Sequence, residues 1–113
     1  MKKINIYINP SSLALTSEQI LELNKIGPHR LFENYLSYAL QSQAGGGLKG
    51  VHARIYAKLL ERLDNTLDSV SVDFEDAEFE LIEKAFFDEQ VAWQPGQIRA
   101  LAAYQKAIID AKG

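Results

Sequence analysis

The chain has 113 residues, of which 47% are hydrophobic and 24% are charged. These values are typical of a folded globular protein rather than a disordered one, and the length suits a single domain over residues 1–113. The net charge of −3 and the absence of cysteine make nucleic acid an unlikely partner and exclude disulfides, thiolate zinc sites and cysteine nucleophiles.

The N-terminal segment alternates between apolar and polar residues. Ile4, Ile6 and Ile8 are separated by polar or amphipathic residues, which predicts a half-buried strand over 3–8 that ends before Pro10. The segment lacks the continuous apolar stretch of a signal peptide, and no window of the chain resembles a membrane span. We therefore expect a cytoplasmic protein with no membrane partner.

Two helices are predicted next. Thr16 and Gln19 stand at the two positions of a capping box, which predicts a short helix from this point to about Lys25. Gly27 ends that helix, and Pro28 suits the first turn of the next one, over residues 28–43. That second helix is apolar over half of its circumference, so we expect it at the centre of the fold.

The rest of the chain supplies three more helices and one more strand. Leu48, Val51, Ile55, Leu59 and Leu63 recur at helical spacing and predict a helix over 48–67. Residues 70–74 alternate and form the only credible partner for the first strand, in an antiparallel sense on general frequency. Helices to about Glu89 and from Gln94 to about Ala111 complete a helix-dominated α+β fold with about five helices and a two-stranded sheet.

Charge is strongly segregated along the chain. Residues 68–89 contain nine acids and one base, a net charge of −8, whereas the remainder carries eleven bases against six acids. Asp76, Glu80 and Glu83 share one helical stripe that Phe87 continues. This pattern predicts a docking segment for a protein partner with a basic surface, although an ordinary solvated helix face has the same pattern.

The acids of residues 73–78 form a cluster of a kind that can bind calcium or magnesium. Four carboxylates fall within these six residues, but a calcium loop of the EF-hand type needs a central glycine and a later glutamate in a non-helical loop. Acids in a first helical turn complement the helix dipole without a metal. We therefore predict no metal ligand.

A glycine-rich segment separates the second and third predicted helices. Residues 45–50 match the letters of a dinucleotide-binding fingerprint, but that fingerprint follows a strand, whereas a helix precedes this one. The segment is interpreted as a flexible connection, with anion binding left open. No cofactor is predicted.

His29, His52 and Trp93 are the remaining residues of chemical interest. His52 is predicted on the apolar face of its helix, and neither histidine has partners at a spacing that implies a triad. No catalytic residue is predicted. Trp93 lies beside a turn, where it either anchors a partner or folds back over the core.

The last helix has two apolar sides. Ile98, Leu101, Ala102, Ile108 and Ile109 are predicted to face the core. Almost opposite lies a stripe of small residues: Ala100, Ala103, Ala107 and Ala111. Such a stripe lets another helix approach closely, which predicts a contact within the chain or a homo-oligomer; alanine also simply favours helix.

Three classes of function remain. The first is a non-enzymatic interaction protein, such as an adaptor, assembly or regulatory factor, of a size and composition also common among phage-encoded proteins. The second is an acidic inhibitor that mimics nucleic acid, and the third is a small enzyme. The first two require that the acids remain hydrated, unpaired with the cations Arg54, Lys58, Arg62 and Arg99.

Overall fold

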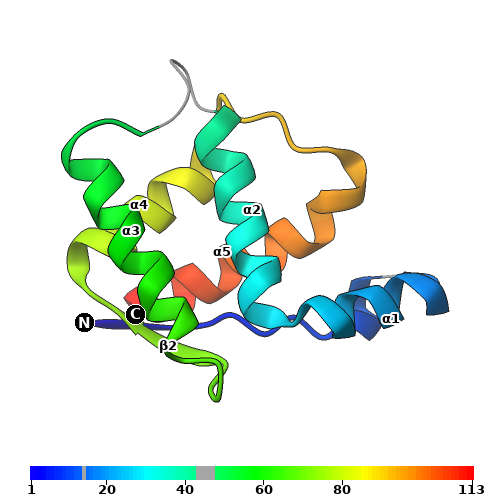
Figure 1. Cartoon of the computed structure of the whole chain (residues 1–113). Helices are drawn as coiled ribbons and strands as arrows, with labels where there is room; N and C mark the ends of the chain where they lie inside the picture. Colours follow the sequence, from blue (N-terminus) through cyan, green and yellow to red (C-terminus); the bar gives the residue numbers. More distant parts are fainter. Residues whose placement is uncertain (14, 43–47) are drawn as a thin grey trace.

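The computed structural model describes residues 1–13, 15–42 and 48–113 (Figure 1). Within these residues, five α-helices and a two-stranded sheet form a helix-dominated α+β fold, which confirms the predicted class. The elements in chain order are β1 (Lys2–Asn5), the 3-10 helix η1 (Pro10–Leu13), α1 (Ser17–Ile26), α2 (Pro28–Ser42), α3 (Val51–Asp64), β2 (Ser71–Phe74), α4 (Asp76–Phe87), the 3-10 helix η2 (Pro95–Gln97) and α5 (Ile98–Lys112).

The two strands pair antiparallel, as predicted, with Lys2 opposite Phe74 and Ile4 opposite Val72. Regular pairing is shorter than the predicted 3–8 and 70–74, although the Ile6 amide still donates to the Val70 carbonyl at 2.8 Å. The alternation of burial continues beyond the paired residues, because Ile4, Ile6 and Ile8 are all buried. The apolar face of the sheet therefore forms one wall of the core.

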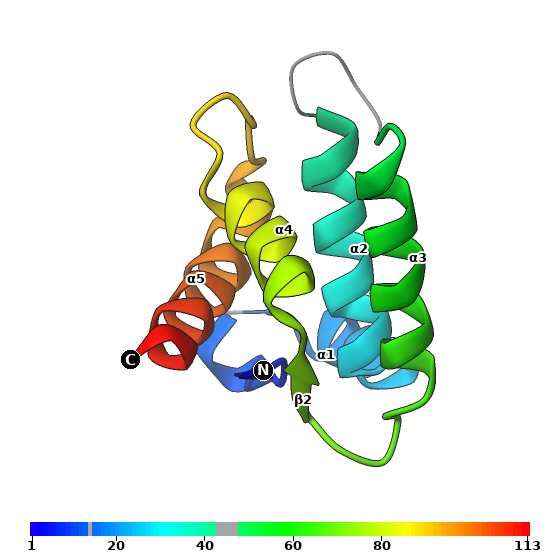
Figure 2. The same ribbon diagram turned by 90° about the vertical axis from the view of Figure 1, so that its left-hand side faces the viewer.

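The core is centred on aromatic side chains that come from four different elements. The Phe32 ring of α2 lies 6.2 Å from that of Phe74, 5.7 Å from that of Phe86 and 5.4 Å from that of Tyr104, measured between ring centroids. Helix α2 packs against α1, α3 and α4, and Figure 2 shows α4 between α5 on one side and α2 with α3 on the other. The prediction of a central second helix fits this arrangement.

Local sequence signals fix α1. Thr16 and Gln19 form the predicted capping box, with the Thr16 hydroxyl accepting from the Gln19 amide and the Gln19 side chain accepting from the Thr16 amide. The helix ends at Gly27, whose φ of 85° and ψ of 161° suit glycine alone. No residue of α1 is buried, so the helix projects from the body of the molecule (Figure 1).

Helix α3 differs from its prediction. It begins at Val51 rather than residue 48, and Val51 and His52 are exposed. The buried residues are Leu59 and Leu63, with Ile55 only half-buried. The fully buried residues of α3 lie only in its second half, whereas Val51 at its start is exposed to solvent. The placement of His52 on a core-facing surface was wrong.

Helix α5 turns a different side towards the core from the one predicted. Ile98 and Ile109 are 48% and 57% exposed, respectively, whereas Tyr104 is buried beside Leu101 and Ile108. The large Tyr104 ring contacts Phe32 and Phe86 and so determines which side of the helix faces inward. This rotation also turns the alanine stripe towards the body of the protein.

Candidate interaction surface

The acidic stripe lies on the outer side of α4, but two of its three members have cationic partners. Glu80 pairs with Lys84 one turn later, with Nζ 3.0 Å from Oε1, and both side chains are well exposed. Glu83 pairs with Lys112 of α5, with Nζ 2.7 Å from Oε2. Asp76 is exposed and forms no ion pair with the described residues. The stripe is therefore partly neutralised.

One acid of residues 68–89 is buried inside the protein. Glu78 is only 2% exposed, and its two carboxylate oxygens accept from Arg62 Nε at 2.7 Å and Arg62 Nη2 at 3.2 Å. The hydrogen bond with Glu78 is the main cause that raises the pKa of Arg62. The same guanidinium reaches Glu75 at 3.7 Å. The expectation that the acids stay hydrated and unpaired is thus wrong for Glu78.

The remaining charge is still strongly negative. The nine acids of residues 68–89, taken with their partners Arg62, Lys84 and Lys112, leave a net charge of −6. Arg54, Lys58 and Arg99 form no ion pair with these acids in the described part of the chain. The exposed acids gather where β2 passes into α4, and we call Asp73, Glu75, Asp76 and Glu80 the acidic face.

The two aromatic residues predicted to contact a partner, Phe87 and Trp93, differ in their surroundings. Phe87 is partly exposed at the end of α4. Trp93 instead folds over the core, with its ring 5.9 Å from Tyr35, 5.1 Å from Tyr38 and 6.1 Å from Phe86. The Tyr38 hydroxyl donates to the Ala92 carbonyl and holds this loop in place. Of the two interpretations of Trp93, the structure matches the one in which it covers the core.

The alanine stripe of α5 is largely occupied within the chain. Ala100 is 4% exposed and belongs to the core, so it cannot contact a second copy as predicted. The rest of the stripe, Ala103, Ala107 and Ala111, packs at the edge of the core and faces β1. Between these two elements runs a groove of about 310 Å³, lined by Lys3, Asn5, Tyr7, Ala103, Lys106, Ala107, Asp110 and Ala111.

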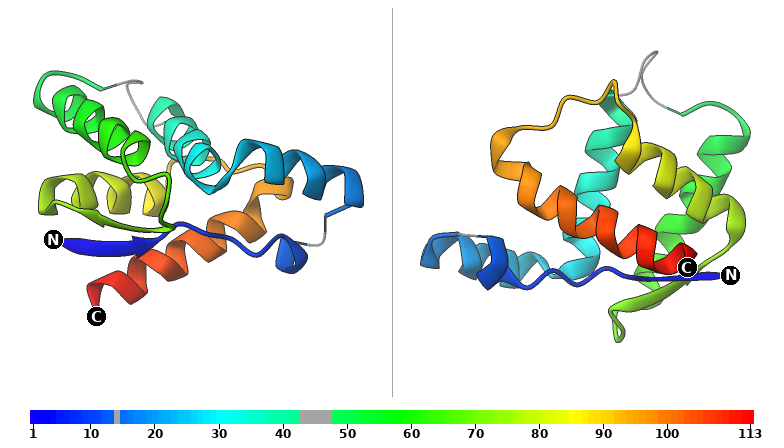
Figure 3. Two further views of the ribbon diagram at one scale, coloured as in Figure 1. Left: turned by 60° about the horizontal axis from the view of Figure 1, so that its bottom comes forward. Right: turned by 180° about the vertical axis from the view of Figure 1, so that it is seen from behind.

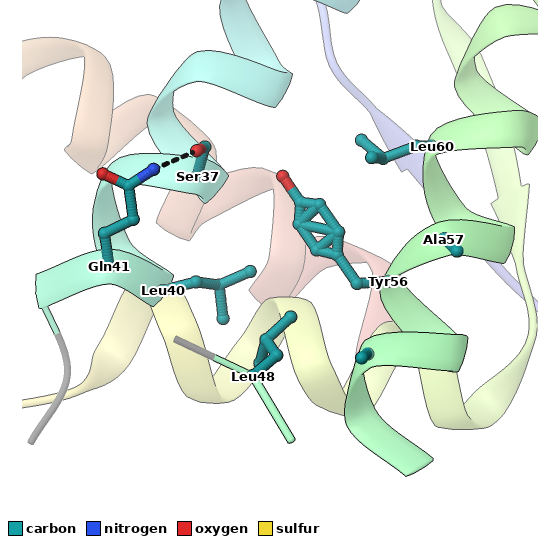
Figure 4. Close-up of a pocket in the computed structure, with 8 residues that line it drawn as sticks. Ser37, Leu40, Gln41, Leu48, Tyr56, Ala57 and Leu60 are labelled. Atoms are coloured by element: carbon teal, nitrogen blue, oxygen red, sulfur yellow. Dashed lines mark hydrogen bonds between the residues drawn. The ribbon is translucent and has the colours of Figure 1, made fainter. Parts of the chain in front are cut away.

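A more apolar groove, which the sequence did not suggest, lies between α2 and α3 (Figure 4). Its volume is about 370 Å³, and Gln41 donates to the Ser37 hydroxyl at 3.2 Å on its rim. Burial is the main cause that raises the pKa of Tyr56 in its wall. The sequence feature that corresponds to this groove is the pair of small residues Ala53 and Ala57, one helical turn apart in its wall. The lining residues are Ser37, Leu40, Gln41, Leu48, Ala53, Tyr56, Ala57 and Leu60.

The other candidate groups serve the fold. His29 is buried, and its Nε2 lies 2.8 Å from the Thr66 carbonyl and 2.9 Å from the Ser69 carbonyl, so a proton there ties α2 to the loop before β2. Among the described residues, no group of three histidine, aspartate or glutamate side chains could hold a metal ion. Residues 45–47 of the glycine-rich segment lie outside the described residues, whereas Leu48, Lys49 and Gly50 are described and precede α3.

Comparison with known proteins found no matching family model, no similar curated protein and no similar solved structure. In the described part of the chain, no helix has the length and apolar character needed to cross a membrane.

Proposed function

We propose that this protein is a non-enzymatic interaction protein, an adaptor, assembly or regulatory factor of the cytoplasm, whose acidic face contacts a basic surface of another protein. The observation that carries the proposal is that all four acids of the acidic face are exposed. They belong to residues 68–89, which keep a net charge of −6 after the ion pairs with bases among the described residues have been counted. Uncompensated surface charge of one sign attracts partners of the opposite sign and suppresses wrong ones.

The acidic face is held in a defined shape. The Glu75 amide donates to Glu78 Oε1 at 3.3 Å within a capping box that starts α4. Arg62 then ties the same turn to α3 through both carboxylate oxygens of Glu78. Because the turn is fixed, a partner meets these acids without the entropic cost of ordering a loop.

The two alternatives receive less support from the geometry. A mimic of nucleic acid needs regularly spaced hydrated carboxylates over a large area, whereas Glu78 is buried and Glu80 and Glu83 are paired. A small enzyme needs convergent acid, base or nucleophile groups, and the described histidines are split between a buried structural position and an exposed one. Self-association through the alanine stripe is disfavoured because Ala100 is buried.

The test is a double charge reversal, Asp76→Lys with Glu80→Lys. The matched control is Glu18→Lys with Glu22→Lys, because these residues of α1 are also exposed, also four residues apart and also begin in the first turn of a helix. The immobilised full chain and both variants capture proteins from a lysate of the source cells, and bound proteins are quantified over a salt series. Circular dichroism confirms that each variant is folded.

We expect basic proteins that elute at moderate salt to bind the wild type and the α1 control and to be lost with the α4 variant. Identical capture by all three chains refutes the acidic face as a contact surface. Wild-type capture that is restricted to nucleic-acid-binding proteins, and that added DNA or RNA abolishes, indicates the inhibitor alternative instead.

A further inference from the structure

Helix α5 keeps a line of apolar residues on its solvent side. Ile98 and Ile109 are 48% and 57% exposed, and Ala102 between them is exposed as well. The right view of Figure 3 shows α5 at the front of the molecule, and none of the described elements covers it there. We call Ile98, Ala102 and Ile109 the outer seam.

The spacing of the outer seam is that of a helix that packs against another helix. Positions 98, 102, 105, 109 and 112 follow one another in alternating steps of four and three residues, the pattern that keeps one line of side chains facing a second helix. Gln105 and Lys112 stand on the flank nearer to α4, where Gln105 donates to the Phe86 carbonyl at 2.8 Å and Lys112 pairs with Glu83. The contacts with α4 therefore leave the outer seam itself uncovered.

The opposite flank of the outer seam carries one base and one acid without partners. Arg99 and Asp110 lie about 20° apart around the helix, on the side where Asp110 lines the groove beside β1. Both are exposed, and neither forms an ion pair with a described residue. They are eleven residues apart in the sequence, about 16 Å along the helix axis, so they cannot pair with each other within one chain.

A second copy of α5, laid antiparallel along the outer seam, matches the apolar and the charged positions in one register. In a two-fold contact, residue i contacts residue j of the other copy and j contacts i. Placing Ile98 opposite Ile109 of the second copy brings Arg99 within about 3 Å, measured along the axis, of Asp110 of the second copy. The same flank of each copy lies on the same side of such a pair, so the base and the acid face each other at both ends. This self-complementarity selects a second copy of the chain as the occupant.

We propose that the outer seam is the contact surface of an antiparallel homodimer. Two helices of 15 residues meet along one seam, and Lys106 on the same flank approaches its own counterpart, so we expect a contact smaller than the roughly 1,200 Å² of a standard stable interface and a dissociation constant on the order of 10–100 µM. The inference goes beyond the proposed function and is independent of it, because the acidic face lies on β2 and α4. It also differs from the alanine stripe, which faces β1.

The test uses two single charge reversals of the full chain, Arg99→Asp and Asp110→Arg, each alone and mixed in equal amounts. Alone, each variant places like charges opposite each other at both ends of the contact, whereas the mixture places opposite charges at both ends. Association is measured by sedimentation velocity from micromolar to near-millimolar concentration, and circular dichroism checks that each variant is folded.

A second pair of variants tests the outer seam itself. Ile98→Gln with Ile109→Gln removes its two large apolar side chains. The matched control is Leu21→Gln with Ile26→Gln on α1, because these side chains are also apolar and are 63% and 44% exposed.

We expect the wild type and the α1 control to dimerise and the glutamine variant of the outer seam to remain monomeric. Each charge reversal alone should weaken the dimer about tenfold, and the mixture should regain the affinity of the wild type. The Asp76→Lys, Glu80→Lys chain should dimerise as the wild type does, so a failure of the acidic face leaves this result unchanged. The proposal is overturned if the wild type stays monomeric at all concentrations, if the glutamine variant of the outer seam dimerises equally well, or if the mixture associates no better than either reversal alone.

Discussion

The buried pair of Arg62 and Glu78 gives the sharpest prediction for stability. Arg62→Met removes the only base that contacts the Glu78 carboxylate in the described structure, and Glu78 is 2% exposed. Breaking a buried ion pair by removing one partner typically costs about 3–5 kcal/mol. The Arg62 side chain is 26% exposed and Glu78 retains its bond from the Glu75 amide, so we expect a loss near the lower limit, about 3 kcal/mol.

The opposite change should cost less. Glu78→Met leaves Arg62 able to reach water and Glu75, whose carboxylate is 3.7 Å away. Its cost is the lost capping bond and hydrogen bonds, about 1–2 kcal/mol. The double variant removes both charges and should lose little more than Glu78→Met alone, because replacing a whole buried pair by apolar side chains is often neutral.

The assay is urea unfolding at pH 7, followed by circular dichroism. With an m-value of about 1.5 kcal/mol/M for a chain of this size, the midpoint for Arg62→Met should fall by about 2 M. If the two single losses simply add in the double variant, the pair is not coupled and the reasoning fails.

Three further predictions concern the tyrosines and the first helix. Tyr104→Phe should raise the free energy of unfolding by about 1 kcal/mol, because the buried Tyr104 hydroxyl has no hydrogen-bond partner in the described structure; a lower urea midpoint would contradict this. Stability should fall as the pH rises above about 10, because burial raises the pKa of Tyr35, Tyr56 and Tyr104 above 10.0. The unfolded chain releases these protons first, so urea midpoints at pH 9 and pH 11 test the sign. Thr16→Ala should cost about 1 kcal/mol of local stability in α1 and should speed amide exchange there, with α4 unaffected.

Features set by neighbouring residues were predictable from the sequence. The alternation of Ile4, Ile6 and Ile8 gave the correct buried face of the first strand, and Thr16 with Gln19 gave the correct start of α1. Gly27 gave its end. In each case the physical cause, a two-residue period, a side-chain cap or a positive φ, acts within a few residues of chain.

The sides of α3 and α5 that face the core depend instead on contacts between residues far apart in the sequence. Residues 98–112 are apolar on two sides, so periodicity alone favoured a face containing Ile98 and Ile109, which are exposed. The deciding contact is Tyr104 with Phe32, which is 72 positions away in the sequence. His52 was misplaced for a related reason, because no element in the described part of the chain covers the exposed start of α3.

The burial of individual acids in residues 68–89 also depends on contacts with residues distant in the sequence. Glu78 and Glu80 are two residues apart and count equally in a sum of sequence charge, yet a helix turns about 200° over two residues. One carboxylate therefore faces Arg62 inside the protein and the other faces solvent. The ion pair that lowers the charge of the segment also fixes the turn that presents Asp73, Glu75 and Asp76. Hence Arg62→Met should disturb the geometry of the acidic face although it leaves one more negative charge unpaired, and binding of a basic partner should weaken rather than strengthen.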